Sequence, residues 1–161
     1  MAGPEIETIA LRRLVDGYAR AVDRGDAEAF VELFEPDAIL QVFHGSEADG
    51  PTTESRGRPA LGQIPGRLKA RYSRTFHFVG NHMCEVRGDE ATGEAYCLAH
   101  HLTENAHGGT DYVMLIRYHD DYRRRPGDSW KFAHRRLTVD WTELRTALPP
   151  GLAGRPASAI R

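Results

Sequence analysis

The hydrophobic pattern of this sequence changes its period near residue 75, and this change limits what the chain can fold into. Apolar residues before that position recur every three or four residues, as on one face of a helix, whereas later ones alternate at every second residue, as on a strand. Helices followed by a run of long strands predict an α+β fold. We expect the helices to cover one face of an antiparallel or mixed sheet.

The first helix is expected over residues 5–24, because its apolar residues form a single stripe. That stripe consists of Leu11, Leu14, Val15, Tyr18, Ala19 and Val22. Gly25 is suited to end this helix in a left-handed turn, and Asp26 is suited to cap a second helix. The second helix is expected to include Phe34 and to stop at Pro36.

Three further elements are expected before the strands of the second half. A short strand is predicted over 39–43, and the polar residues of 45–53 predict an exposed loop. A third helix is expected over 59–72, with an interruption at Pro65 and Gly66.

The alternating half of the chain predicts four antiparallel strands, over 78–86, 94–103, 111–122 and 130–141. The predicted connections are a hairpin loop over 88–93 and a turn over 125–128. We expect one domain over residues 1–147. The tail, 148–161, is rich in proline, glycine and alanine and is expected to be either a loose extension or a flap over the domain.

The first hairpin raises a question of register. If it closes symmetrically, Cys84 faces Cys97, and His101 lies on the face opposite to His77. The two histidines can share a site only if the register changes between them. Gly80–Asn81 is a suitable place for a β-bulge that would bring this about.

Composition limits the partners and the compartment. With 161 residues, 21 Lys and Arg against 23 Asp and Glu, and a net charge of −2, the chain suits one globular domain and offers no strong attraction for nucleic acid or an anionic membrane. No apolar run is long enough to span a membrane, and the first residues lack the parts of a secretory signal. We therefore expect a cytoplasmic protein whose two cysteines stay reduced.

Four segments in order resemble the SnoaL-like branch of the nuclear transport factor 2-like superfamily. They read LVDGYARAVDRGDAEAFVELFEPDA, TFHFVGN, GDEATGEAYCLAHH and WKFAHRRLTVDW, and the resemblance spans residues 6–145. Within that branch the chain is most similar to the scytalone dehydratase group, which includes a bile-acid dehydratase and a hexachlorocyclohexane dehydrochlorinase. The resemblance implies a cone-shaped, curved sheet that wraps around the N-terminal helices and encloses a pocket.

The resemblance also implies a set of catalytic residues. The catalytic pair of the family falls on Asp23 and His77, its second histidine on His101, and a pocket tyrosine of the bile-acid dehydratase on Tyr18. In such a site His77 would act as the base, with its tautomer and positive charge supported by Asp23. His101 would protonate a leaving group and Tyr18 would polarise a substrate oxygen, with no metal or organic cofactor.

The residue pattern leaves alternatives open. Asp23 could be an exposed helix-end residue, and His77 or Tyr18 could serve core packing alone. The adjacent arginines Arg135 and Arg136 are typical of a solvated sheet edge, although one of them could orient an acidic substrate. No zinc-hydrolase or cupin spacing of metal ligands occurs among the histidines.

The family's scytalone-binding side chains are not retained, so scytalone itself is not an expected substrate. The two substrate-binding tyrosines of scytalone dehydratase fall near Val22 and Phe43 of this chain, and its pocket asparagine falls near Met114.

Two classes of function follow. The first is a cofactor-independent lyase of the dehydratase type, or an isomerase, acting on a hydrophobic oxygenated small molecule such as a polyketide, steroid or aromatic intermediate. The second is a non-catalytic binding or assembly domain, like the small subunit of a ring-hydroxylating dioxygenase.

A homo-oligomer is also expected, and the resemblance favours a trimer over a dimer. The strands from residue 111 to residue 141 carry more apolar and aromatic residues than one layer of helices can cover, so we expect the outer sheet face to be partly buried in the oligomer. These residues include Tyr112, Met114, Ile116, Trp130, Phe132 and Trp141.

Overall fold

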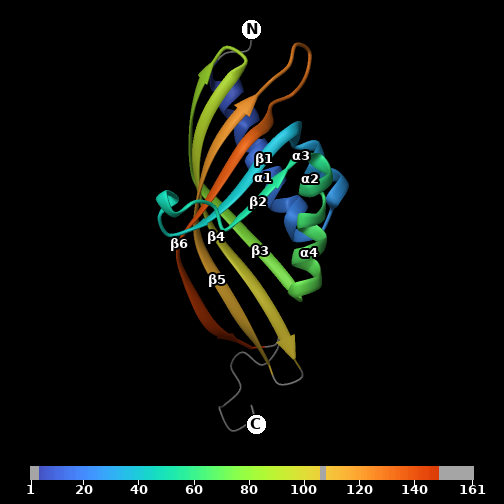
Figure 1. Cartoon of the computed structure of the whole chain (residues 1–161), viewed down its shortest axis with the longest axis vertical. Helices are drawn as coiled ribbons and strands as arrows, with labels where there is room; N and C mark the ends of the chain where they lie inside the picture. Colours follow the sequence, from blue (N-terminus) through green and yellow to red (C-terminus); the bar gives the residue numbers. More distant parts are fainter. Residues whose placement is uncertain (1–3, 106–107, 149–161) are drawn as a thin grey trace.

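The computed structural model describes residues 4–105 and 108–148. Helices precede the long strands, as the change of period predicts (Figure 1). The helices are α1 (Pro4–Arg24), α2 (Ala27–Glu32), the 3-10 helix η1 (Glu47–Asp49), α3 (Gly57–Leu61) and α4 (Gln63–Arg71). The strands are β1 (Phe34–His44), β2 (Thr53–Arg56), β3 (Arg74–Arg87), β4 (Glu90–Asn105), β5 (Gly108–Arg123) and β6 (Lys131–Ala147).

All six of these strands form one mixed sheet with the order β2–β1–β6–β5–β4–β3. β1 runs parallel to β6, and the other neighbouring pairs are antiparallel. Figure 1 shows a long, twisted sheet with α2, α3 and α4 grouped beside its middle, while the end of β4 extends beyond the helices. The predicted α+β architecture with a mixed sheet is confirmed.

The first helix has the predicted face and the predicted end. Every residue of the apolar stripe is buried in the core. Gly25 follows the helix with φ of 66°, a conformation in which glycine avoids the strain of a side chain. Asp26 caps α2 by accepting a hydrogen bond from the backbone N–H of Ala29 at 2.9 Å. The last turn of α1, which carries Asp23, is therefore fixed beside the sheet.

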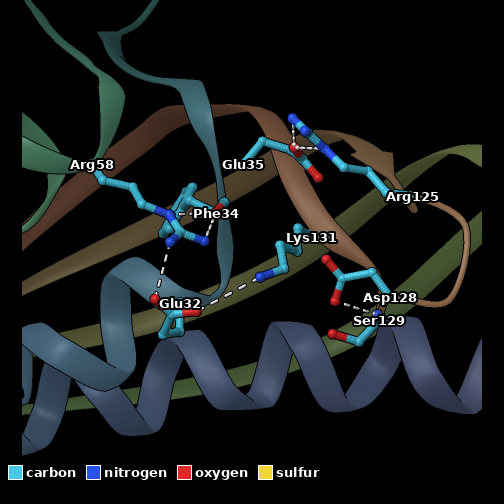
Figure 2. Close-up of polar contacts among 8 residues, drawn as sticks. All are labelled: Glu32, Phe34, Glu35, Arg58, Arg125, Asp128, Ser129 and Lys131. Carbon is cyan, nitrogen blue, oxygen red and sulfur yellow. Dashed lines mark hydrogen bonds and ion pairs between the residues drawn. The ribbon is translucent and has the colours of Figure 1, made fainter.

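The second helix ends earlier, and the next strand begins earlier, than predicted. Phe34 belongs to β1 rather than to α2, and the β1–β6 register shifts between Phe34 and Ile39. Pro36 lies in this irregular stretch, where its missing N–H costs no ladder hydrogen bond. Arg58 donates two hydrogen bonds to the carbonyl oxygen of Phe34, at 2.9 and 3.1 Å, and one to Glu32 (Figure 2). These bonds hold the start of the strand in place.

The third predicted helix is two helices, and the break lies at Gly62 rather than at Pro65 and Gly66. Pro65 is the third residue of α4, within the first turn, where a backbone N–H would have no helical acceptor. Proline is therefore tolerated there. The predicted loop over 45–53 contains η1, and β2 begins at its last residue.

The turn between β3 and β4 is shorter than predicted and consists of Gly88 and Asp89. Cys84 therefore pairs with Gly93, and the predicted placement of Cys84 opposite Cys97 is wrong. Both thiols are free.

The β-bulge predicted at Gly80–Asn81 is confirmed. The register shifts between Gly80 and Met83, and Asn81 has a positive φ of 49°. One extra residue on β3 places His77 opposite Ala99, two residues before His101 on β4. Because alternate residues of a strand share a face, His77 and His101 lie on the same side of the sheet.

Arg135 lies in the core, so its predicted position on a solvated sheet edge is wrong. Its side chain is fully buried and forms two hydrogen bonds with Asp120, at 2.8 and 2.9 Å. The rings of Tyr18, Tyr118 and Phe132 lie 3.9–4.2 Å from its guanidinium carbon. Alternation explains the error, because Arg135 shares the inner face with Leu137, which is buried.

Most of the six apolar residues that led us to expect a partly buried outer face belong to the inner side of the sheet instead. Trp130 and Phe132 are buried in the core, and Tyr112, Met114 and Ile116 pair with the inner-face residues of β4. Trp141 is exposed. The exposed aromatic side chains of the outer face are Phe76, Phe78, Tyr96 and Trp141.

None of the described helices is both long enough and apolar enough to cross a membrane. The predicted tail lies outside the described residues from position 149 onward, and so does its expected role as an extension or a flap.

Candidate active site

Asp23 and His77 meet in space although 54 residues separate them in the sequence. The last turn of α1 supplies Asp23, and the first half of β3 supplies His77. Nδ1 of His77 lies 2.7 Å from Oδ1 of Asp23, and the two side chains are 6% and 23% exposed, respectively. The structure therefore brings the predicted pair together in a sheltered position.

The carboxylate of Asp23 is held by three donors. The backbone N–H of His77 donates to Oδ2 at 3.0 Å, and the Thr75 hydroxyl donates to Oδ1 at 2.9 Å, beside the His77 ring. Burial by itself would raise the pKa of Asp23, but the hydrogen bonds from His77 and Thr75 lower it below its ordinary value. Asp23 is thus ionised at neutral pH and can only accept hydrogen bonds.

The carboxylate fixes the tautomer of the His77 ring. Because Asp23 only accepts, Nδ1 of His77 carries the hydrogen, and Nε2 carries the lone pair when the ring is neutral. Nε2 has no hydrogen-bond partner among the described residues and is not fully buried. His77 therefore keeps a basic nitrogen that no described residue occupies.

His101 lies beside His77, with ring centroids 5.5 Å apart and ring planes at 83°. Its residue is 4% exposed and packs against the rings of Tyr72 and Tyr112. Nδ1 of His101 lies 3.1 Å from the carbonyl oxygen of Tyr112. Burial lowers the pKa of His101 to about 4, and the charge of His77 acts in the same direction, so the ring is neutral at physiological pH.

Tyr18, the fourth predicted residue, lies in the aromatic core. Its ring contacts Phe30, Phe34, Tyr118 and Phe132, and the Arg135 guanidinium lies over it. Burial raises the pKa of Tyr18 to about 12, against the opposing effect of the Arg135 charge. Within residues 4–105 and 108–148 the structure shows no hydrogen bond from Tyr18 to the Asp23–His77 pair.

Two supporting groups were not predicted from the sequence. Thr75 precedes His77 by two positions and so shares its face, a spacing that could have identified it as a partner of Asp23. The carbonyl group of Tyr112 could not be identified, because only the strand register places it beside His101.

Small side chains occupy the inner face of β4, the strand that carries His101. Ala95, Cys97 and Ala99 are all buried, and the small size of Ala99 leaves room for the rings beside it. Burial raises the pKa of the Cys97 thiol to about 11, so this thiol is protonated at neutral pH and is a poor nucleophile.

A carboxylate-supported histidine beside a second, neutral histidine is suited to proton transfer. The described residues contain no group of three or more His, Cys, Asp or Glu side chains arranged to hold a metal ion.

Comparison with known proteins agrees with the sequence resemblance. Residues 7–136 match the family model described as a SnoaL-like domain. No curated protein sequence matches the chain significantly.

Solved structures share the fold at low identity. A candidate scytalone dehydratase from Novosphingobium aromaticivorans is 24% identical, with a TM-score of 0.72 over 91% of this chain and 94% of that chain. A hexachlorocyclohexane dehydrochlorinase from Novosphingobium barchaimii is 19% identical, with a TM-score of 0.71 over 91% and 99%. An NTF2-like protein with a cystatin-like fold, also from N. aromaticivorans, is 24% identical, with a TM-score of 0.59 over 80% and 79%.

Proposed function

Because the chain belongs to the SnoaL-like family, we propose that it is a cofactor-independent lyase of the dehydratase type, or an isomerase. Its substrate is a hydrophobic oxygenated small molecule, in the class of polyketide, steroid or aromatic intermediates. The Asp23–His77 pair supplies the general acid–base chemistry.

The proton transfers begin at Nε2 of His77. This nitrogen takes a proton from a carbon next to a carbonyl group, and the electron pair of the broken C–H bond forms an enolate. Asp23 stabilises the imidazolium that results, as the carboxylate of a catalytic triad does. In a dehydration, the imidazolium returns the proton to a departing hydroxyl group, which leaves as water. In an isomerisation, the proton returns to another carbon of the substrate.

One observation carries this proposal: the 2.7 Å contact between Asp23 and Nδ1 of His77 leaves Nε2 of His77 without a partner among the described residues. An assembly domain would not require a partly buried carboxylate that accepts three hydrogen bonds, two of them from one histidine. The names of two structural neighbours, a candidate dehydratase and a dehydrochlorinase, also favour elimination chemistry.

We assign Tyr18 to core packing with Arg135 and leave it out of the proton transfers. The position of Tyr18 within the aromatic cluster supports this choice, since its ring already contacts four others.

The direct test is a thermal-shift screen with alcohols and β-hydroxy ketones of the three substrate classes, followed by mass spectrometry of each stabilising compound. We expect at least one compound to stabilise the protein and to lose the mass of water or to isomerise. Compounds that bind but are recovered unchanged would favour the non-catalytic alternative.

We also propose that the protein self-associates through the outer sheet face. The side chains of Phe76, Phe78, Tyr96 and Trp141 are 37–64% exposed there, which corresponds to roughly 400 Å² of exposed aromatic surface. A stable interface buries roughly 800 Å² on each partner. Charged residues at the edge of this aromatic surface already form ion pairs within the chain, as Arg117 does with Asp140 and Arg145 with Glu143. A second copy of the chain that packs there would therefore meet little unpaired charge.

A further inference from the structure

The hydrogen position on His101 is set by the strand next to it. A backbone carbonyl oxygen can only accept a hydrogen bond, so the 3.1 Å contact with Tyr112 requires the hydrogen to be on Nδ1 of His101. Nε2 of the neutral ring therefore carries a lone pair. Like Nε2 of His77, it has no hydrogen-bond partner within the described residues and is not fully buried.

The surroundings of His101 keep the ring in this state. Tyr72 and Tyr112 cover it with aromatic carbon, and His77 lies at its edge. The carboxylates of Asp23 and Asp111 act on it from α1 and β5 and favour protonation, but burial outweighs them and lowers the pKa of His101 to about 4. A neutral His101 with its hydrogen on Nδ1 has no proton on Nε2 to give to a leaving group. The role of acid expected for His101 therefore does not fit its environment.

We infer that Nε2 of His101 accepts a hydrogen bond from a hydroxyl group of the substrate, which makes the substrate an alcohol rather than an organic halide or a simple ketone. This inference rests on the proposed function and gives His101 a substrate-binding role. Halogen and carbonyl oxygen atoms offer no hydrogen, so either would place a lone pair against the lone pair of Nε2. A site built to bind a hydroxyl group discriminates strongly against analogues that lack it.

The same arrangement completes the proposed dehydration. His77 takes the carbon-bound proton and then gives it to the oxygen of the substrate hydroxyl group as the C–O bond breaks, with both electrons of that bond going to oxygen. The hydroxyl hydrogen stays covalently bonded to its oxygen, donates a hydrogen bond to Nε2 of His101, and leaves as part of the water. The products are an alkene conjugated to the carbonyl group, one molecule of water and a neutral His77.

The first test needs no ligand. Long-range ¹H–¹⁵N correlation spectra of protein labelled with ¹⁵N-histidine distinguish a protonated ring nitrogen from one that carries a lone pair. We expect His101 at pH 7 to show hydrogen on Nδ1 and a lone pair on Nε2. Finding the hydrogen on Nε2, or a doubly protonated ring, would overturn the inference.

The second test compares two probes of nearly equal size, 1-tetralol and 1-tetralone, by titration followed with the same spectra. We expect 1-tetralol to bind about tenfold more tightly, which corresponds to about 1.4 kcal/mol, and to shift the Nε2 resonance of His101. His101→Phe should abolish the preference, and His101→Gln, which keeps an acceptor, should restore part of it.

The neighbouring variant His100→Phe is the matched control, because His100 lies on the outer face and pairs with Asp111. Equal binding of both probes, no binding of 1-tetralol at millimolar concentration, or a preference that survives His101→Phe would each contradict the role of His101. The binding preference is measured in the wild-type protein without turnover, so it does not depend on whether the proposed catalysis occurs. A failure of catalysis is thereby separated from a failure of this inference.

Discussion

His77 and His101 present their rings to the same side of the sheet, with centroids 5.5 Å apart. They do so because β3 has one residue more between the hairpin turn and His77 than β4 has between the turn and Ala99, the residue opposite His77. Without the bulge at Gly80–Asn81, the register of the turn would place His77 opposite His100. His77 would then point to the outer face and lose Asp23. The bulge at Asn81, four residues from His77, therefore brings the two histidines to one side of the sheet.

Substitution of Asn81 tests this relationship. Its φ of 49° suits Asn or Gly, whereas a β-branched residue is strained there by roughly 1–2 kcal/mol. We expect Asn81→Gly to keep both the fold and the ring contact between His77 and His101. Asn81→Val should weaken that contact and lower the melting temperature, as measured by nuclear Overhauser effects and calorimetry. Normal ring contacts in Asn81→Val would show that the bulge does not depend on this residue.

The bulge also shows how far sequence alone reaches. The apolar stripe of α1, the turn at Gly25 and the bulge at Gly80–Asn81 follow from local residue types, and all three are confirmed. The register of the β3–β4 hairpin does not follow from local residue types, because the glycine and polar residues over 88–93 permit several turns. A shift of the strand pairing by one residue moves every side chain to the other face of the sheet. The burial of Arg135 escaped prediction for the same reason, since the residues that pair with it come from other strands.

The low pKa of His101 predicts a pH-dependent stability. Between about pH 4 and the ordinary histidine pKa near 6.5, the unfolded chain binds a proton at this residue and the folded chain does not. Above pH 6.5, His101 therefore makes its full contribution to the free energy of unfolding. This free energy should fall by about 1 kcal/mol per pH unit as the pH decreases from there toward 4. Urea denaturation at several pH values measures this slope.

His101→Phe supplies the control for that slope. Burial also lowers the pKa of His82, which adds a slope of the same sign in both proteins. The wild-type chain should therefore lose stability relative to His101→Phe as the pH falls below 6.5. Parallel curves for the two proteins would mean that His101 is not buried in its neutral form.

Self-association is tested by a single charge on the outer face. Phe78 is 64% exposed, and we expect Phe78→Glu to dissociate the assembly, because a carboxylate would be buried without a partner. Ile9→Glu is the control, since Ile9 is exposed on α1. Light scattering should give a multiple of the 18.0 kDa chain mass for wild type and for the control. A wild-type monomer at micromolar concentration would refute the interface.

Tyr18→Phe separates packing from catalysis. The change removes one hydroxyl group and leaves the ring contacts with Phe30 and Phe34 intact. If Tyr18 only packs, turnover should stay within a few-fold of wild type, and the melting temperature should change by a few degrees at most. A loss of two or more orders of magnitude in kcat at an unchanged melting temperature would return Tyr18 to the catalytic set.

The central claim is that Asp23 supports the charge that His77 acquires when it takes a proton. Asp23→Asn keeps the size of the side chain and an acceptor for Thr75, but it removes the negative charge and permits the wrong tautomer of His77. Asp26→Asn is the matched control, three residues away, because Asn and Asp cap helices equally well.

The decisive measurement is kcat of these two variants on the alcohol identified by the screen, with melting temperatures recorded in parallel. We predict that Asp23→Asn lowers kcat by about four orders of magnitude, as loss of the carboxylate does in catalytic triads, while the melting temperature falls by only a few degrees. Asp26→Asn should leave both unchanged. Turnover that survives in a folded Asp23→Asn variant would contradict the proposed mechanism.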